Sequence, residues 1–319
     1  MIQRRLSIFF LSLVLLGLAS GALSTEFREV YSSEVHDGAP SWGPGGESIA
    51  FTSTKSGDWE VWTVDAWGGE PVNFSEYPDT TDIYADWSPD GTRIAFSSKR
   101  NNGHGLNDYD IWIQDLSTRE IICVTEYDGY DNWATFDPTG SKIAFTSERG
   151  GDKQIWVMPL ADPSAAFQVS VGTEECQHAC WSPDGNWLAY DAVMEGGGQR
   201  AVFRVPADGS GASAELIPTG LLVATNPHWS PDGRYLALAG GDDVVDWDLY
   251  LWDLNEESLI QLTDTRYPEQ SPVWNDTGTE IAYAAVIAEN KDLWVAYELP
   301  VGTATESLDW GDLKSRFGR

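Results

Sequence analysis

Trp87-Ser88-Pro89-Asp90-Gly91 is the stretch that decides the fold, because the chain repeats it at nearly constant spacing. It recurs intact at Trp181–Gly185 and Trp229–Gly233. Altered copies that keep an aromatic residue and a final glycine stand at Trp42–Gly46, Phe136–Gly140 and Trp274–Gly278. The six aromatic residues that open these copies, here called the anchor aromatics, are separated by 45, 49, 45, 48 and 45 residues. A fixed period of this size indicates a repeat architecture.

Short runs rich in β-branched and aromatic residues follow each copy and predict strands. Arg93–Ser98 and Lys142–Ser147 come directly after the turn, Gln154–Val157 follows a polar loop, and Ile121–Thr125 ends in threonine. Pro-Asp-Gly suits a tight turn, since proline presets φ and glycine accepts a positive φ. Four antiparallel strands repeated radially make a β-propeller blade. We therefore predict an all-β, six-bladed β-propeller of four-stranded antiparallel blades.

The combined pattern resembles a known family. Trp-Ser-Pro-Asp-Gly, then Ile-Ala-Phe-x-Ser, a Trp-bearing strand and a threonine-ended strand resemble the TolB-type propeller repeat over residues 27–297. The resemblance implies six blades, the number also counted from the anchor aromatics. Peptidases with this propeller carry an α/β-hydrolase domain, and TolB of the cell envelope has an α/β domain before its propeller. Neither domain is found in this sequence, so we expect a free-standing TolB-like propeller.

The domain organisation is predicted as a signal peptide over 1–22, the propeller over 26–300 and a C-terminal tail over 301–319. Arg4 and Arg5 precede an apolar core of 13 residues, Leu6–Leu18, and small residues follow it. This core is too short for a typical membrane span. We expect export to the periplasm or out of the cell and no membrane span after cleavage; an uncleaved anchor is the alternative.

The sequence also predicts which segment closes the propeller. Residues 27–32 stand where a fourth strand precedes each anchor aromatic, so we predict that they close the ring by pairing with 292–297. The alternative is that Thr303–Leu308 supplies this strand. The rest of the tail is a short helix, a disordered end or a docking peptide.

Tryptophan is abundant, with 16 residues in the chain. Ten of them fall on the two periodic aromatic positions and are expected to be wedges between neighbouring blades. The six others are off this register and are candidates to face a ligand: Trp59, Trp67, Trp133, Trp187, Trp247 and Trp310.

Composition excludes some partners. The chain holds 50 acidic and 19 basic residues, a formal charge of −31. This charge argues against nucleic acid and anionic membrane surfaces. It favours cationic partners or divalent metals, and it also fits simple solubility or a saline habitat. We expect a monomer.

Two positions in the predicted blade-to-blade crossings point to a binding face at the mouth of the central channel. Five residues before the anchor aromatics stand Asp37, Asp82, Asp131, Cys176, Ala224 and Glu269. Three residues before them stand Ala39, Tyr84, Trp133, His178, Asn226 and Ser271, which vary as a ligand-facing ring would. The resulting candidate contacts are Asp37, Asp82, Tyr84, Asp131, Trp133, His178, Asn226 and Glu269. The alternative for the repeated aspartates is structural, since a carboxylate can fix a crossing by accepting backbone N–H bonds.

No cofactor is certain from the sequence. Clustered carboxylates could hold Ca²⁺ or another divalent cation, although no segment has the spacing of a calcium loop. Some propeller lyases that resemble this family use channel histidines with a divalent metal, and His178, His228 and Gln270 are the residues to test for that role. Their offsets from the anchor aromatics differ. Cys176 and Cys180 around His178 lack zinc-module spacing and, if extended, are too far apart for a disulfide; a bend would allow one.

The sequence therefore favours an exported, non-enzymatic scaffold that binds a protein segment or small ligand through an acidic, aromatic channel mouth. No nucleophile or phosphate-loop motif is present. The main alternative is a metal-dependent lyase or hydrolase that acts on a sugar or lactone in the channel. A third hypothesis is a structural envelope component that docks through blade edges or the tail.

Overall fold

The computed structural model describes residues 25–300, except 78, 101–107, 126, 128, 171–174, 195, 196, 198, 212, 243–245, 288 and 289. The signal peptide expected at 1–22 and the tail expected at 301–319 lie outside the described residues, as does the alternative closing strand at 303–308. Within the described residues the chain forms 24 strands and one 3-10 turn, η1 (Pro163–Ala165). The chain is therefore all-β.

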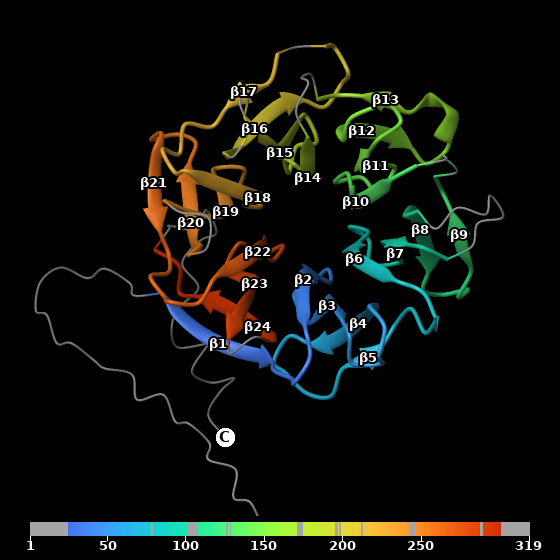
Figure 1. Cartoon of the computed structure of the whole chain (residues 1–319), viewed down its shortest axis with the longest axis horizontal. Helices are drawn as coiled ribbons and strands as arrows, with labels where there is room; N and C mark the ends of the chain where they lie inside the picture. Colours follow the sequence, from blue (N-terminus) through green and yellow to red (C-terminus); the bar gives the residue numbers. More distant parts are fainter. Residues whose placement is uncertain are drawn as a thin grey trace, which may run out of the picture.

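The strands form antiparallel sheets arranged around a central axis (Figure 1). One sheet contains β2 (Asp37–Trp42), β3 (Ser48–Ser53), β4 (Glu60–Asp65) and β5 (Val72–Asn73). The next contains β6 (Asp82–Trp87), β7 (Arg93–Ser98), β8 (Asp110–Asp115) and β9 (Ile121–Cys123). A third contains β10 (Asp131–Phe136), β11 (Lys142–Ser147), β12 (Gln154–Pro159) and β13 (Phe167–Gln168).

A larger mixed sheet follows. It contains β14 (Cys176–Trp181), β15 (Trp187–Val193), β16 (Arg200–Pro206), β17 (Glu215–Leu216), β18 (Val223–Trp229), β19 (Tyr235–Gly241), β20 (Asp248–Asp253) and β21 (Ser258–Gln261). Its two antiparallel groups, β14–β17 and β18–β21, are joined by a single parallel pair between Arg200 and Val223.

The first and last described strands share a sheet. β1 (Glu26–Tyr31) pairs antiparallel with β24 (Asn290–Tyr297), which continues to β23 (Glu280–Ile287) and β22 (Glu269–Trp274). Glu26 lies opposite Tyr297, and Tyr31 lies opposite Leu293. Chain segments from opposite ends of the sequence are thus held side by side.

The strand nearest the axis in each group is the one that ends in an anchor aromatic, namely β2, β6, β10, β14, β18 and β22 (Figure 1). From the sequence, these residues were expected to lie in the crossings between blades. They are strands because their backbone groups pair with β3, β7, β11, β15, β19 and β23.

Anchor aromatics pack between neighbouring sheets, as expected. Trp42 lies in one apolar cluster with Phe51 of its own sheet and with Leu293 and Val295 of β24. Its indole N–H donates to the carbonyl of Val273 on β22 at 3.0 Å. A wedge of this size that is truncated to alanine leaves a cavity, which costs about 3–5 kcal/mol.

The outermost strands are shorter than the sequence suggested. β9 ends at Cys123, and the hydroxyl of Thr125 beyond it accepts the N–H of Ile111 at 2.8 Å. Thr263, beyond β21, does the same for Leu249 at 2.8 Å. The side chain replaces a ladder carbonyl, so the threonine ends the strand. Among the described residues, no helix has the length and apolar character needed to cross a membrane.

Candidate functional site

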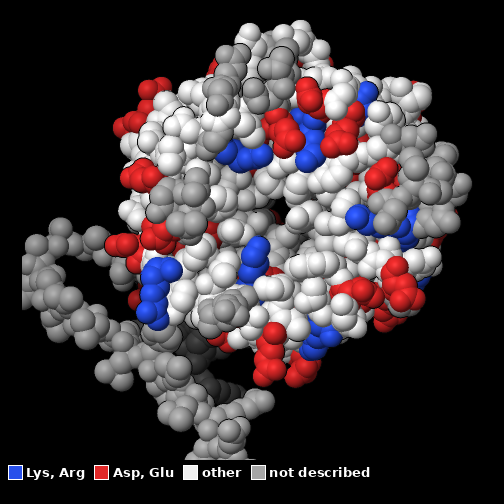
Figure 2. All heavy atoms as spheres, viewed as in Figure 1, with Lys and Arg blue, Asp and Glu red and all other residues white. Residues whose placement is uncertain are grey.

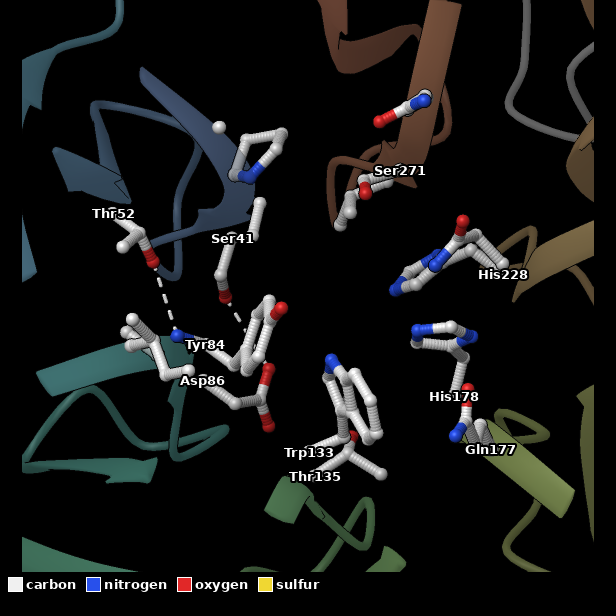
Figure 3. Close-up of a pocket in the computed structure, with 18 of the residues that line it drawn as sticks. Ser41, Thr52, Tyr84, Asp86, Trp133, Thr135, Gln177, His178, His228 and Ser271 are labelled. Carbon is white, nitrogen blue, oxygen red and sulfur yellow. Dashed lines mark hydrogen bonds between the residues drawn. The ribbon is translucent and has the colours of Figure 1, made fainter. Parts of the chain in front are cut away.

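A cavity of about 690 Å³ lies on the central axis, walled by the innermost strands and the loops before the third strands (Figure 3). Three tiers of side chains line it, each built from one position of the repeat. The outer tier comes from residues just before or at the start of the third strands: Trp59, Tyr109, Lys153, Arg200, Trp247 and Lys291. The middle tier lies three residues before the anchor aromatics: Ala39, Tyr84, Trp133, His178, Asn226 and Ser271. The inner tier lies one residue before them: Ser41, Asp86, Thr135, Cys180, His228 and Val273. All but Lys153 line the cavity.

Every middle-tier residue adopts a left-handed backbone conformation, with φ between 49° and 57°. Each lies where the pairing of its strand shifts register, as between Asn132 and Thr135 around Trp133. A residue with a Cβ pays about 1 kcal/mol or more for this conformation. Its repetition at six non-glycine positions shows that the bulge geometry, rather than side-chain preference, imposes it.

At three of the six positions, a hydrogen bond to a side chain of a neighbouring strand stabilises this conformation. The N–H of Tyr84 donates to Thr52 Oγ1 at 3.0 Å, and the N–H of Trp133 donates to Ser97 Oγ at 3.2 Å. The N–H of Asn226 donates to a carboxylate, Asp191 Oδ2, at 2.9 Å. Tyr84, Trp133 and Asn226 are therefore positioned by side chains of the preceding group of strands.

One side of the middle tier is an aromatic wall. The ring centroids of Tyr84 and Trp133 are 5.0 Å apart, and those of Trp133 and His178 are 4.5 Å apart. Ala39, Ser271 and the amide of Asn226 form the rest of this tier, and Ser271 lies across the cavity from Trp133 (Figure 3). The cavity thus has an aromatic half and a half lined by small or polar side chains.

Asp191 of β15 organises the polar part of the wall. Its buried carboxylate accepts His178 Nδ1 at 2.7 Å and Thr225 Oγ1 at 2.8 Å, and it also pairs with Arg200. Burial alone would raise the pKa of Asp191, but the charges and hydrogen bonds of His178 and Arg200 outweigh it and lower the pKa. Because an ionised carboxylate only accepts, His178 carries a proton on Nδ1. Nε2 is the remaining ring nitrogen, and the ring points into the cavity (Figure 3).

Besides the thiol of Cys180, the inner tier contains one acidic and one basic titratable group. Asp86 accepts Ser41 Oγ at 3.2 Å and the N–H of Phe136 at 2.8 Å, and burial raises its pKa to about 6. His228 Nδ1 accepts the N–H of Trp274 at 3.2 Å, and burial lowers the pKa of His228 to about 4. His228 is therefore neutral at pH 7, with its proton on Nε2.

The acidic residues five positions before the anchors are buried, and of these only Asp37 borders the cavity. Asp37, Asp82 and Asp131 have 0% of their surface exposed. Asp82 pairs with Arg100, and Asp131 pairs with Arg149 at 2.6 Å.

Asp37 and Glu269 are held by hydroxyl groups instead. Asp37 accepts the hydroxyl of Ser33 at 2.6 Å. Glu269 accepts the hydroxyls of Thr263 and Thr265, and burial raises its pKa to about 7. These carboxylates accept hydrogen bonds within the protein, which is the structural role weighed as the alternative.

The structure therefore brings together some of the candidate contacts and not others. Five line the cavity: Asp37, Tyr84, Trp133, His178 and Asn226. Three do not: Asp82, Asp131 and Glu269. On the face shown in Figure 2, Lys and Arg side chains lie around the central opening and most Asp and Glu side chains lie farther out. The expected acidic channel mouth is thus replaced by neutral and basic groups.

Trp59 and Trp247, two of the off-register tryptophans, line the cavity, whereas Asp191, Tyr109, Arg200 and Lys291 were not singled out from the sequence. Asp191 stands on β15 at the place that Thr52 and Ser97 hold on their strands. In the outer tier, the carbonyls of four residues accept the first N–H of the next innermost strand at 2.8 Å: Trp59, Tyr109, Lys153 and Trp247. Each outer-tier residue stands the same number of positions before the aromatic residue of its third strand. This constant spacing was the feature of the sequence that could have identified the tier.

The described residues contain no group of three His, Cys, Asp or Glu side chains that could hold a metal ion. Cys176 and Cys180 are buried and form no disulfide with each other. Burial raises the pKa of Cys176 to about 11 and that of Cys180 to about 12, so neither is a thiolate at neutral pH.

Comparison with known proteins places this geometry in a family. The family model described as the TolB beta propeller domain matches residues 104–297. An uncharacterized protein from Agrobacterium fabrum is 33% identical over 113 residues, which are 32% of this chain and 37% of that protein. The chain thus matches well under half the length of this relative.

Solved structures share the fold. The putative TolB from Agrobacterium tumefaciens has a TM-score of 0.67 at 20% identity, over 87% of this chain and 98% of that one. A gluconolactonase from Xanthomonas campestris has a TM-score of 0.61 at 13% identity, over 86% of this chain and 89% of that one. At these identities the likeness shows the fold alone.

Proposed function

Because the chain belongs to the TolB β-propeller family, we propose that it is an exported, non-enzymatic scaffold that binds a protein segment or small ligand in its channel. In this proposal the fold is a monomeric six-bladed ring, with the mixed sheet counted as two blades and the ring closed by β1. The signal peptide over 1–22 directs the chain to the periplasm or out of the cell. Neither nucleic acid nor a membrane is a partner.

The observation that carries the binding proposal is the aromatic wall. Tyr84, Trp133 and His178 contact one another on strained left-handed backbone, and all three line the cavity. Side chains held in this way are preorganised, so a ligand pays little to order them. Asn226 is the fourth contact that we propose, while Asp37, Asp82, Asp131 and Glu269 are buried, bond within the protein and support the fold.

Trp133→Ala tests this proposal. The native protein is screened by thermal shift against sugars, sugar lactones and short peptides, and ligands that raise its melting temperature are titrated against the variant. We expect at least tenfold weaker binding, because the ring of a sugar, a lactone or an aromatic side chain of a peptide loses the surface on which it stacks. Trp67→Ala is the matched control, since Trp67 is 63% exposed and does not line the cavity. Equal binding by native protein and Trp133→Ala would place the ligand elsewhere.

A second candidate is an enzyme that acts on a sugar or lactone in the same channel. The pairing of His178 with buried Asp191 favours it, because a carboxylate that holds Nδ1–H leaves Nε2 to accept a proton. The metal-dependent form fits less well. The described residues hold no three-ligand group, and His228 Nδ1 already accepts the N–H of Trp274.

Melting curves in EDTA and then with Ca²⁺ or Mn²⁺ distinguish the two candidates. A resident metal at a hundredfold excess over its Kd stabilises by about 2.7 kcal/mol. A rise specific to one ion, lost in His178→Ala, would favour the enzyme. The same rise with any salt of equal ionic strength reports screening of the acidic surface instead.

A further inference from the structure

Lys291 is the outer-tier cation without a carboxylate partner. Its ammonium donates to Gln270 Oε1 at 2.9 Å, and both residues line the cavity. Within the described part of the chain, no Asp or Glu lies within ion-pairing distance of it, and burial lowers its pKa. The other two cations of this tier are compensated, Arg200 by Asp191 and Lys153 by Glu175 at 3.8 Å.

The stem of Lys291 is held against the wall. A Cβ added to Gly38 on β2 would meet Lys291 Cδ at 3.6 Å, so the lysine crosses from its own sheet to pack over the next one. Its neighbours in the outer tier are Trp59 and Trp247, from the two adjacent sheets. The ammonium therefore has little freedom to leave for bulk water.

The tier beneath Lys291 is open. Ser271 and Ala39 are the middle-tier residues of the last sheet and of the first, and both are small. The aromatic wall of Trp133 stands on the far side from Ser271 (Figure 3). A partly buried charge destabilises a protein unless an opposite charge pairs with it. The Lys291 ammonium faces the cavity on the side where a bound ligand can supply that charge.

We propose that the channel binds ligands carrying a carboxylate, which pairs with Lys291 and accepts from it beside Gln270, while a ring of the ligand lies toward Trp133. The proposal rests on the channel being a binding site, as proposed above, and it names the class of ligand. A carboxylate of this kind comes from a small ring-bearing acid or from the C-terminus of a peptide.

Matched acid and amide probes test it. Phenylacetate is compared with phenylacetamide, and Gly-Gly-Phe with its C-terminal amide, by calorimetric titration at low ionic strength. We expect the acid of at least one pair to bind at least tenfold more tightly than its amide. The pair that shows this preference identifies the source of the carboxylate.

Lys291→Met keeps the stem and removes the charge, and it should make acid and amide bind alike. Lys291→Gln is the second variant, in case the first unfolds. Lys153→Met is the control, because Lys153 belongs to the same tier but does not line the cavity. Its preference should match that of the native protein.

Three outcomes overturn the inference: equal binding of acid and amide to the native protein, a preference that survives in both Lys291 variants, or no binding of any probe. If both probes bind equally and Trp133→Ala abolishes that binding, the channel still binds ligands and only the carboxylate inference fails. If no probe binds, this inference is rejected, and the ligand screen with Trp133→Ala decides the binding function separately.

Discussion

Asp191 and His178 are joined at 2.7 Å between Oδ2 and Nδ1, across the pair of strands β14 and β15. The same carboxylate reaches β18 through Thr225 and the N–H of Asn226. It therefore joins the two antiparallel groups of the mixed sheet, which share only one backbone pair. The equivalent position holds a hydroxyl residue in the three preceding sheets and alanine on β19 and β23, so the charge of Asp191 is particular to β15.

Asp191→Ala should lower the free energy of unfolding by about 3 kcal/mol, because it leaves Arg200 and the N–H of Asn226 without their acceptor. Urea denaturation measures this. Asp208→Ala is the control, since Asp208 is an exposed loop residue whose carboxylate caps Ser210. A loss no larger than that of the control would show that Asp191 does not hold the sheets together.

Asp86→Asn should stabilise the protein at neutral pH. The pKa of Asp86 is raised from 3.8 to about 6 in the folded state, so ionisation of this group opposes folding. Asp86 ionises near pH 4 in the unfolded state but only near pH 6 in the folded state, so the native protein becomes less stable as pH rises across this range. The asparagine of the variant does not titrate, so the variant should not lose stability in this way. Melting temperatures from pH 4 to 8 check it. Parallel curves for the two proteins would contradict the burial of Asp86.

Arg100→Met should destabilise the protein by about 3–5 kcal/mol, because it leaves the fully buried Asp82 without its cation. Adding Asp82→Asn should restore most of the loss, since the uncompensated charge is then gone. A double-mutant cycle by urea denaturation measures the coupling. Additive effects would mean that the pair does not interact.

Ala39→Gly should stabilise the protein by about 0.5–1 kcal/mol, because φ at Ala39 is 49° and glycine adopts this conformation without strain. Ala179→Gly is the matched control. Ala179 is buried and is not among the positive-φ residues, so glycine there should cost about 1 kcal/mol. Changes of the same sign at both positions would show that the backbone at Ala39 is not strained.

The strand pattern was predictable because each blade repeats its turn chemistry. Residues 93–98 and 142–147 were expected as strands and are strands with the same bounds. The ends of the outermost strands were not predictable, because Thr125 acts through its hydroxyl beyond the strand. Hydrophobic pattern records which residues are apolar, but it does not record where a side chain replaces a backbone acceptor.

The candidate site was predictable only where a residue type varied at a constant offset. Variation singled out Tyr84, Trp133, His178 and Asn226, which line the cavity. Acidic residues at the neighbouring offset misled, because Asp82 and Asp131 lie before the register shift in their strands and pair there with Arg100 and Arg149, which come 18 residues later in sequence. Sequence order does not show which charges meet.

The pairing of β1 with β24 also sets the order in which the molecule can form. The two strands are made first and last, so β1 has no partner until nearly all of the described chain has been synthesised. At typical rates of synthesis this interval is about 10–50 s. Throughout it, β1 and the edges of the unfinished sheets expose unpaired N–H and C=O groups that invite association with other chains. A nascent chain of this kind depends on being kept apart from its neighbours until its last strand arrives.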